Sequence, residues 1–208
     1  MDVLVVGAAA LYDHIFPVRE LPSKGRVAEI LATRPTEGNA YFGGCAFNIA
    51  VTMTKLGAGC ALMHAVGADF PGSDYEKYLG GQGISLDGIQ VHRELQSGHA
   101  FLFYDRQGET LCFSYPGAAS EPLSLDRLNT FLDQVSMVVI APVFSPSSAR
   151  IIQIARNYPL KLAACGIAAA ELMPFLGQID ILIANQYEIQ SLCQACGADG
   201  PFELGPSL

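Results

Sequence analysis

The chain has 208 residues, of which half are hydrophobic and 15% are charged, and its formal net charge is −8. This composition can fill a substantial core and excludes an intrinsically disordered chain. The acidic balance argues against non-specific binding to nucleic acid, because the twelve Lys and Arg residues form no basic cluster. It does not exclude a phosphorylated small ligand, since backbone N–H groups at helix starts bind phosphate without net positive charge.

Apolar runs and helical patterns alternate along most of the chain. Five continuous apolar runs are typical of strands buried in a parallel sheet: residues 2–7, 61–66, 136–141, 160–164 and 179–184. Helical patterns fall between them: residues 46–56, residues 71–79 opened by Pro71, a helix capped by Ser124, and one that starts at Ser145-Pro146 and stops before Pro159. The alternation predicts a mainly parallel sheet with helices on both faces.

Two stretches break this alternation. Residues 19–42 hold several Pro and Gly residues around one strand-like run at 27–32. Residues 99–115 alternate between apolar and polar and fold back at 105–108, which is a hairpin signal. These pieces fit either an edge hairpin on the main sheet or a small separate sheet that acts as a lid.

The sequence favours a cytoplasmic protein. Charged residues and prolines interrupt every long apolar stretch, and the acidic Asp2 precedes the apolar run at residues 3–12, where a signal peptide would carry positive charge. In the cytoplasm the six cysteines would stay reduced. The closest pair, Cys193 and Cys196, lies at the end of a predicted helix and not at its start, where the helix dipole lowers a thiol pKa. We therefore expect neither a redox nor a metal role for this pair.

Candidate ligand-binding residues lie where the predicted strands end, because ligands of open α/β sheets bind beyond the carboxyl ends of the strands. The first strand leads towards Asp13, and Gly43-Gly44 directly precedes a predicted helix. Adjacent glycines let a ligand approach the backbone closely, and Asn48 on the next helical turn can both donate to and accept from a hydroxyl. Taken alone, the glycine pair is more typical of a simple turn than of a binding site, and Asp13 would serve equally well as a turn acceptor.

Three segments together form a more specific pattern. The segments 43–50 (Gly-Gly-Cys-Ala-Phe-Asn-Ile-Ala), 55–57 (Lys-Leu-Gly) and 66–72 (Val-Gly-Ala-Asp-Phe-Pro-Gly) resemble the N-terminal signature of the ribokinase-like (PfkB) kinases of carbohydrates and nucleosides. The resemblance implies a three-layer α/β/α sandwich with a small β lid, formed by the two irregular stretches. Four further segments are most similar to the adenosine and nucleoside kinase branch: residues 7–13, 78–79, 83–86 and 113–118.

The resemblance implies roles for the acceptor side of the site. Asp13 would accept hydrogen bonds from the hydroxyls of a sugar or ribose, and Asn48 would bind another hydroxyl. Gly43 and Gly44 would admit the sugar against the backbone. Such a site rejects analogues that lack the hydroxyls, because its own polar groups would be left unpaired. The implied partner is a small-molecule sugar or nucleoside, and neither nucleic acid nor a membrane is expected.

A second motif follows the last predicted strand. Asn185-Gln186-Tyr187-Glu188 resembles the Asn-x-x-Glu motif of the family, which implies that Asn185 and Glu188 organise Mg²⁺ beside the phosphate transferred from ATP. Much of this contact would run through water, since Mg²⁺ keeps several waters and takes few carboxylates. The same spacing is that of a helix N-cap with its capping-box partner. The two roles are compatible, and the resemblance favours the metal-organising one.

The sequence departs from the family where the catalytic base is expected. The family's base is the aspartate of a Gly-Ala-Gly-Asp motif, whose helix N-terminus also forms the anion hole, and this motif does not occur in the chain. Residues 164–166 also lack the aspartate that related nucleoside kinases carry there, and Cys45 stands where some sugar kinases have lysine. We therefore expect residues 1–196 to form an incomplete, C-terminally truncated kinase domain and residues 197–208 an irregular tail.

Three function classes remain open. The first is a PfkB-type carbohydrate or nucleoside kinase by lineage, with ATP-dependent phosphoryl transfer to a sugar or ribose hydroxyl, whose isolated chain is inactive because base and anion hole are absent. The second is a non-catalytic homologue that binds a sugar, a nucleoside or a partner chain. The third, an unrelated nucleotide-binding protein, is disfavoured because residues 7–12 lack the later glycines of a dinucleotide loop.

A sheet that ends at 179–184 would expose an apolar edge, which predicts aggregation, or a homodimer through that face or through the lid.

Overall fold

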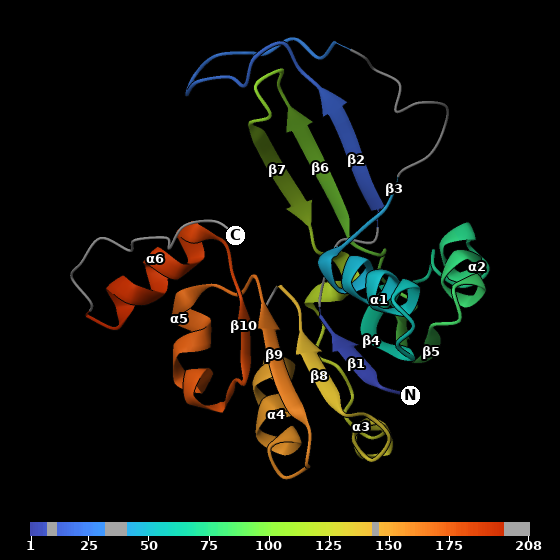
Figure 1. Cartoon of the computed structure of the whole chain (residues 1–208). Helices are drawn as coiled ribbons and strands as arrows, with labels where there is room; N and C mark the ends of the chain where they lie inside the picture. Colours follow the sequence, from blue (N-terminus) through green and yellow to red (C-terminus); the bar gives the residue numbers. More distant parts are fainter. Residues whose placement is uncertain (8–11, 32–40, 143–145, 198–208) are drawn as a thin grey trace.

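The computed structural model describes residues 1–7, 12–31, 41–142 and 146–197 (Figure 1). These residues form a six-stranded sheet with the strand order β10-β9-β8-β1-β4-β5 and a four-stranded sheet with the order β3-β2-β6-β7. All neighbours in the large sheet are parallel. The small sheet stands beyond the carboxyl ends of the large sheet's strands. The predicted α/β sandwich with a separate β lid is confirmed, and the edge-hairpin alternative is wrong.

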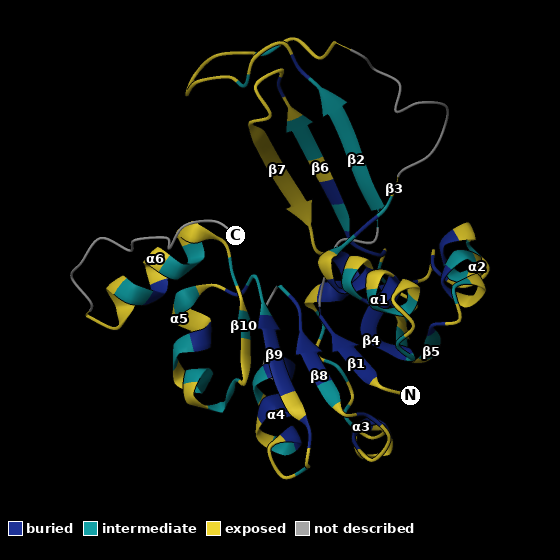
Figure 2. Ribbon diagram, viewed as in Figure 1, coloured by how far each residue is buried: buried dark blue, intermediate teal, exposed yellow. Residues whose placement is uncertain are grey.

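The large sheet has a hydrophobic core on each face. Its strands are β1 (Val3–Val6), β4 (Cys60–Gly67), β5 (Ser85–His92), β8 (Met137–Ile140), β9 (Lys161–Cys165) and β10 (Ile181–Ile183). Side chains alternate between the two faces of a strand, so Leu4 and Val6 enter one core while Val3 and Val5 enter the other. Figure 2 shows β1, β4 and most of β8 and β9 as buried. Each of the five predicted apolar runs overlaps one of these strands; β5 was not predicted.

The helices divide between the two faces. Helices α1 (Cys45–Lys55) and α2 (Asp74–Gly81) contribute to one core. The other core receives side chains from α3 (Leu128–Leu132), α4 (Pro146–Ala155), α5 (Ala169–Leu172) and α6 (Gln186–Ala195). Short 3-10 helices at Gly117–Ser120 and Met173–Gln178 complete the described helical elements. None of the helices in the described part of the chain is long and apolar enough to cross a membrane.

Two predicted helix starts are wrong. The helix expected from Pro71 begins at Asp74, because the hydroxyl of Ser73 accepts a hydrogen bond from the Glu76 N–H at 3.1 Å and caps it. The helix that Ser124 was expected to cap begins only at Leu128. The Ser124 hydroxyl instead donates to the carboxylate of Asp126 at 2.8 Å, which holds a turn before the helix.

The lid contains β2 (Tyr12–Pro17), β3 (Tyr41–Phe42), β6 (His99–Tyr104) and β7 (Thr110–Tyr115). The β6–β7 hairpin lies where it was predicted. The strand expected at 27–32 is not formed in its described part, residues 27–31, where Ile30 makes an isolated bridge with Val18. The sequence did not predict β2, which enters the lid from residue 12. Apart from Gly197, the expected tail at 197–208 lies outside the described residues.

One half of the large sheet is open on the face that carries α1. Over β8, β9 and β10 this face borders a hollow of about 480 Å³, and no described helix fills it (Figure 1). We call it the apolar hollow; it is lined by Asn48, Ile49, Thr52, Met53, Met137, Val139, Ala163, Cys165, Ile181 and Ile183. The side chain of Ile183 is 55% exposed there. An exposed apolar surface at the last strand was expected from the sequence.

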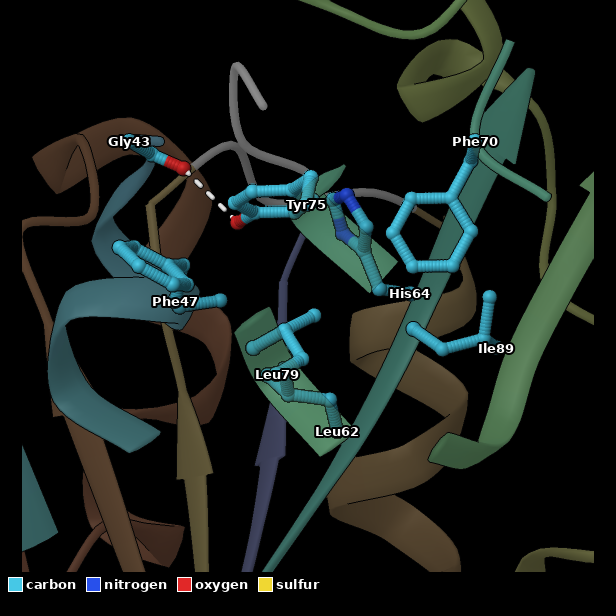
Figure 3. A pocket seen from close by; sticks show the side chains of 9 residues that line it. Gly43, Phe47, Leu62, His64, Phe70, Tyr75, Leu79 and Ile89 are labelled. Atoms are coloured by element: carbon cyan, nitrogen blue, oxygen red, sulfur yellow. Dashed lines mark hydrogen bonds between the residues drawn. The ribbon is translucent and has the colours of Figure 1, made fainter. Parts of the chain in front are cut away.

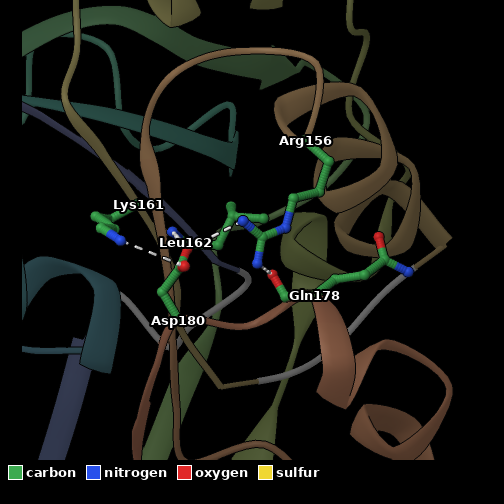
Figure 4. A network of polar contacts seen from close by, with 5 residues as sticks. All are labelled: Arg156, Lys161, Leu162, Gln178 and Asp180. Atoms are coloured by element: carbon green, nitrogen blue, oxygen red, sulfur yellow. Dashed lines mark hydrogen bonds and ion pairs between the residues drawn. The ribbon is translucent and has the colours of Figure 1, made fainter.

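A polar network joins the starts of β9 and β10 to the end of α4 (Figure 4). The carboxylate of Asp180 accepts a hydrogen bond from the Leu162 N–H at 2.8 Å and forms ion pairs with Arg156 at 3.1 Å and Lys161 at 3.6 Å. Arg156 also donates to the carbonyl of Gln178. The backbone bond and the nearby cations hold the pKa of Asp180 below its usual value.

Candidate functional site

Asp13 and Gly43 lie against each other where the lid joins the large sheet. Asp13 belongs to β2 and pairs with Tyr41 of the antiparallel strand β3, so the chain reaches Gly43 two residues later. A β-carbon placed on Gly43 would overlap the carboxylate of Asp13. Only glycine at this position leaves room for the carboxylate beside the backbone. Two of the predicted site residues are therefore brought together.

The carboxyl of Asp13 is half-buried, and burial raises its pKa above the usual value of an aspartate. Its charge in turn contributes to the raised pKa values of Cys45, Cys112 and Tyr75, after the larger effect of burial at each of these groups. Asp13 thus lies in a region of restricted water between the lid and the sheet. A carboxylate in such a place is a strong acceptor for ligand hydroxyls.

Gly44 connects this point to α1. Its φ of 103° lies in the region that favours glycine, and its carbonyl accepts the N–H of Asn48 at 2.9 Å. No side chain caps the helix. Asn48 itself is exposed and lines the apolar hollow together with Cys165. The structure thus places Gly44 beside Gly43, and Asn48 on the side of α1 that faces the hollow.

Asn185 and Glu188 form a complete capping box at the start of α6. The side-chain oxygen of Asn185 accepts from the N–H groups of Tyr187 at 2.9 Å and Glu188 at 3.0 Å. One carboxylate oxygen of Glu188 accepts from the Asn185 N–H at 2.8 Å. The cap that the sequence offered as the alternative is therefore present. The metal-organising role stays a prediction for both residues.

The second carboxylate oxygen of Glu188 turns towards the end of β9. It lies 3.7 Å from the position that a β-carbon on Gly166 would take. One carboxylate oxygen beside open backbone suits a cation that keeps most of its waters, as Mg²⁺ does. In the described part of the chain, no group of three or more His, Cys, Asp or Glu side chains is arranged to hold a metal. Any Mg²⁺ held here would therefore take few protein ligands.

Cys45 connects the two halves of the site. Burial raises the pKa of its thiol, and so do Cys165, Asp13 and Glu188. Charges act on one another in this way only over short distances, because water and salt screen them. Glu188 likewise adds to the raised pKa of Cys165, after burial. With their pKa values raised, both thiols stay protonated and weakly nucleophilic at neutral pH.

Two further residues shape the site, and the sequence did not reveal their roles. Tyr75 of α2 donates a hydrogen bond to the carbonyl of Gly43 at 3.2 Å (Figure 3). Its spacing from Leu79 marks a buried helix face, but no local signal connects it to a backbone group 32 residues away. The second residue is Asp69, whose carboxylate accepts hydrogen bonds from the N–H and the hydroxyl of Ser97, both at 2.8 Å.

Comparisons with known proteins show the family of the chain. Residues 1–201 match the model of the pfkB family of carbohydrate kinases. The chain belongs to this family. A nucleoside kinase of Methanothermobacter thermautotrophicus is 27% identical over 229 aligned positions, which cover the whole chain and 68% of the relative. The predicted ribokinase-like lineage is confirmed, and members of the family are phosphotransferases with an alcohol group as acceptor.

Solved structures share the fold. The crystal structure of the nucleoside kinase of Methanocaldococcus jannaschii has a TM-score of 0.70 at 23% identity, over 98% of this chain and 66% of that one. The nucleoside kinase of Burkholderia thailandensis in complex with inosine has a TM-score of 0.78 at 19% identity, over 94% of this chain and 64% of that one. The pfkB-family chain thus spans about two thirds of the length of these relatives.

Proposed function

We propose that this chain provides the acceptor-binding part of a nucleoside or sugar kinase. The observation that carries the proposal is the carboxylate of Asp13 beside the bare backbone of Gly43, at the joint between lid and sheet. A ligand hydroxyl placed there would meet a strong acceptor with little competition from water. Gly44 and the exposed amide of Asn48 extend the surface that a sugar ring would contact.

A nucleoside is the favoured ligand. The M. thermautotrophicus relative is a nucleoside kinase, and the similar B. thailandensis enzyme was solved with inosine. Another structure of the B. thailandensis protein contains ADP together with inosine. We therefore propose ATP as the phosphoryl donor of the whole enzyme, with the acceptor a ribose or other sugar hydroxyl.

Phosphoryl transfer needs the acceptor in line with the donor, neutralisation of phosphate charge and a group that receives the hydroxyl proton. Asp13 would orient the sugar through its hydroxyls. Glu188 would contact Mg²⁺ through its second carboxylate oxygen, and Asn185 would keep that side chain in place through the capping box. Bound Mg²⁺ and ATP would supply charge neutralisation and the transferred group. The lid would exclude water from the reaction.

We expect the isolated chain to bind an acceptor without phosphorylating it. The sequence contains no Gly-Ala-Gly-Asp segment, so the family's base and anion hole are absent from these residues. Asp13 does not replace them in this proposal, because its role is to hold hydroxyls that do not react. The binding function and the transfer function are therefore separable in experiment.

Isothermal titration calorimetry with adenosine, inosine and ribose tests the binding function. Asp13→Asn should weaken binding about tenfold or more, since hydrogen bonds to a charged group contribute about 1.5–3 kcal/mol. Asp133→Asn makes the same chemical change at an exposed position and should leave the affinity unchanged. Absence of heat with every ligand, or equal affinities in both variants, would contradict the proposal. The isolated chain is expected to be inactive as a kinase. Turnover of ATP by the unmodified chain, abolished by the Asn185→Ala substitution, would contradict that expectation.

The outer face of the lid supports a homodimer as a second part of the proposal. Side chains alternate along β2, so Tyr12, His14 and Phe16 lie on the face opposite to Asp13. His14 stacks on Phe101 of β6 with ring centroids 4.8 Å apart. The face continues to the edge strand β7 with the exposed side chains of Leu111, Phe113 and Tyr115. Exposed apolar patches of this kind mark contact surfaces.

A further inference from the structure

Tyr75 forms a buried hydrogen bond beneath the candidate site. Its side chain is 1% exposed, and its phenolic O–H donates to the carbonyl oxygen of Gly43 at 3.2 Å (Figure 3). The bond runs from α2 to the short segment between β3 and α1. A buried hydroxyl that lost this acceptor would go unpaired, at a cost of about 1–3 kcal/mol, so the geometry is strongly favoured.

The ring of Tyr75 contacts aromatic side chains from four different segments. The ring centroids lie 4.7 Å from Phe42, 5.1 Å from Phe47, 5.8 Å from Phe70 and 5.9 Å from Tyr12. Pairs at these distances stabilise one another beyond the effect of burial alone. Tyr12 directly precedes Asp13, and Phe42 directly precedes Gly43. One side chain thus contacts the immediate neighbours of both predicted site residues.

The Gly43–Gly44 segment needs an external constraint of this kind. Glycine permits the close approach of Asp13, but it also has more conformational freedom than any other residue. Gly44 provides no side chain to cap α1. The Tyr75 hydroxyl, which lies outside the segment, fixes the backbone of the segment at the carbonyl of Gly43.

We propose that Tyr75 is a positioning residue of the acceptor site: its hydroxyl fixes the Gly43 carbonyl and so keeps the backbone of residue 43 against the carboxylate of Asp13. The expected effect of Tyr75 on ligand affinity rests on the proposed function. Its expected effect on the surroundings of Asp13 does not. Tyr75 touches no ligand in this proposal. It acts through the placement of Gly43 and Asp13 alone.

Tyr75→Phe removes one oxygen and keeps the ring in its aromatic surroundings. Tyr78→Phe is the matched control, because Tyr78 lies one helical turn away and also packs against Phe42 and Phe47, at 5.6 and 6.0 Å. Within the described residues its hydroxyl makes no hydrogen bond. Thermal unfolding of both variants measures any general loss of stability. A purely structural Tyr75 would alter only that measurement.

A carbon-13 NMR titration of the Asp13 carboxyl is the first test. Burial raises the pKa of Asp13 in the folded protein, and a loosened Gly43 segment would let water reach the carboxyl. We expect Tyr75→Phe to shift the Asp13 midpoint down towards the ordinary aspartate value, and Tyr78→Phe to leave it in place. Cys45, Cys112 and Tyr75, the groups that the Asp13 charge affects, do not titrate in this acidic range. An unchanged midpoint in Tyr75→Phe overturns the proposal.

Calorimetry with inosine is the second test. We expect Tyr75→Phe to weaken binding about three- to tenfold, the effect of one neutral hydrogen bond, and Tyr78→Phe to bind as the unmodified chain does. In an Asp13→Asn background the Tyr75→Phe change should have no further effect, because both act through the same contact. Equal affinity with and without the Tyr75 hydroxyl contradicts the proposal. If the unmodified chain binds no nucleoside, the proposed function fails and the NMR titration alone decides the role of Tyr75.

Discussion

The carboxylate of Asp13 occupies the space in which residue 43 would otherwise carry a β-carbon. The two residues are brought together by the antiparallel pairing of β2 with β3, in which Asp13 lies opposite Tyr41. The requirement for glycine at 43 is one of space and not of backbone conformation, since its φ is not in the left-handed region. This distinction gives the contact a direct test.

Gly43→Ala should displace Asp13 and abolish nucleoside binding. Overpacking of a filled site costs about 1–3 kcal/mol of unfolding free energy, so the variant should be destabilised but folded. Gly80→Ala is the matched control. Gly80 belongs to α2, and a β-carbon on it would meet open space. It should stabilise the chain by about 0.5–1 kcal/mol through helix propensity. Chemical denaturation and calorimetry check both effects, and a Gly43→Ala chain that binds normally would show that the contact is dispensable.

Much of the fold could be predicted from the sequence. Continuous apolar runs mark the strands of a parallel sheet because both faces of these strands are buried. β5 was missed because it is an edge strand that includes the exposed Asp87 and the half-buried Gln90. β2 was missed because Asp13, His14 and Pro17 give it a polar, loop-like composition. Its place in the lid depends on pairing with β6, which begins 87 residues later and leaves no local signal.

The candidate site could be predicted from the sequence only in part. Asp13, Gly43 and Gly44 could be named because the family resemblance covers their motifs, but the resemblance carries no information on what fixes them. Tyr75 acts on Gly43 through a contact between distant segments, so neither motif nor periodicity identifies it. The Asn-x-x-Glu motif was compatible with a cap and with a metal site, and the structure shows the cap.

The cap and the proposed metal role of Asn185 and Glu188 can be separated by substitution. Asn185→Ala removes the N-cap and should lower the unfolding free energy by about 1 kcal/mol. Glu188→Gln keeps an oxygen that can accept from the Asn185 N–H but removes the charge, so the cap should persist. If Glu188 organises Mg²⁺, stabilisation of the chain by MgCl₂ in thermal unfolding should disappear in Glu188→Gln. Retention of the full Mg²⁺ effect would contradict that role and leave Glu188 as a capping residue.

His64 should make the fold less stable in mild acid. The ring is buried, its Nδ1 lies at the carbonyl of Gly7, and its Nε2 has no partner among the described residues (Figure 3). Burial lowers the pKa of His64 below 6.5, so the folded chain holds it neutral while the unfolded chain takes up a proton below about pH 6.5. Its contribution is therefore complete above that pH and lost progressively as pH falls towards the folded pKa. Denaturation midpoints should fall between about pH 7.5 and pH 5.5, and less steeply in His64→Gln.

Asp180 should act in a lower pH range. Its pKa lies below the usual value because the Leu162 N–H and the cations Arg156 and Lys161 favour the ionised form. A lowered folded pKa means that its stabilising effect is complete above about pH 4 and is lost as pH falls through the folded value. Asp180→Asn should therefore destabilise the chain at neutral pH and flatten the acid limb of a melting profile. An acid limb identical to that of the unmodified chain would show that other carboxylates cause it.

Self-association should run through the outer face of the lid and not through the apolar hollow. A two-fold dimer joins the same patch of both copies, and a flat aromatic face can pack on itself, whereas two concave surfaces cannot fill each other. Phe113 on the lid face and Ile183 at the hollow are similarly exposed, at 57% and 55%. Phe113→Lys should therefore give a monomer in sedimentation velocity, while Ile183→Lys should sediment like the unmodified dimer. A monomeric unmodified chain, or a dimer that only Ile183→Lys disrupts, would contradict this assignment and identify the hollow as the surface through which copies associate.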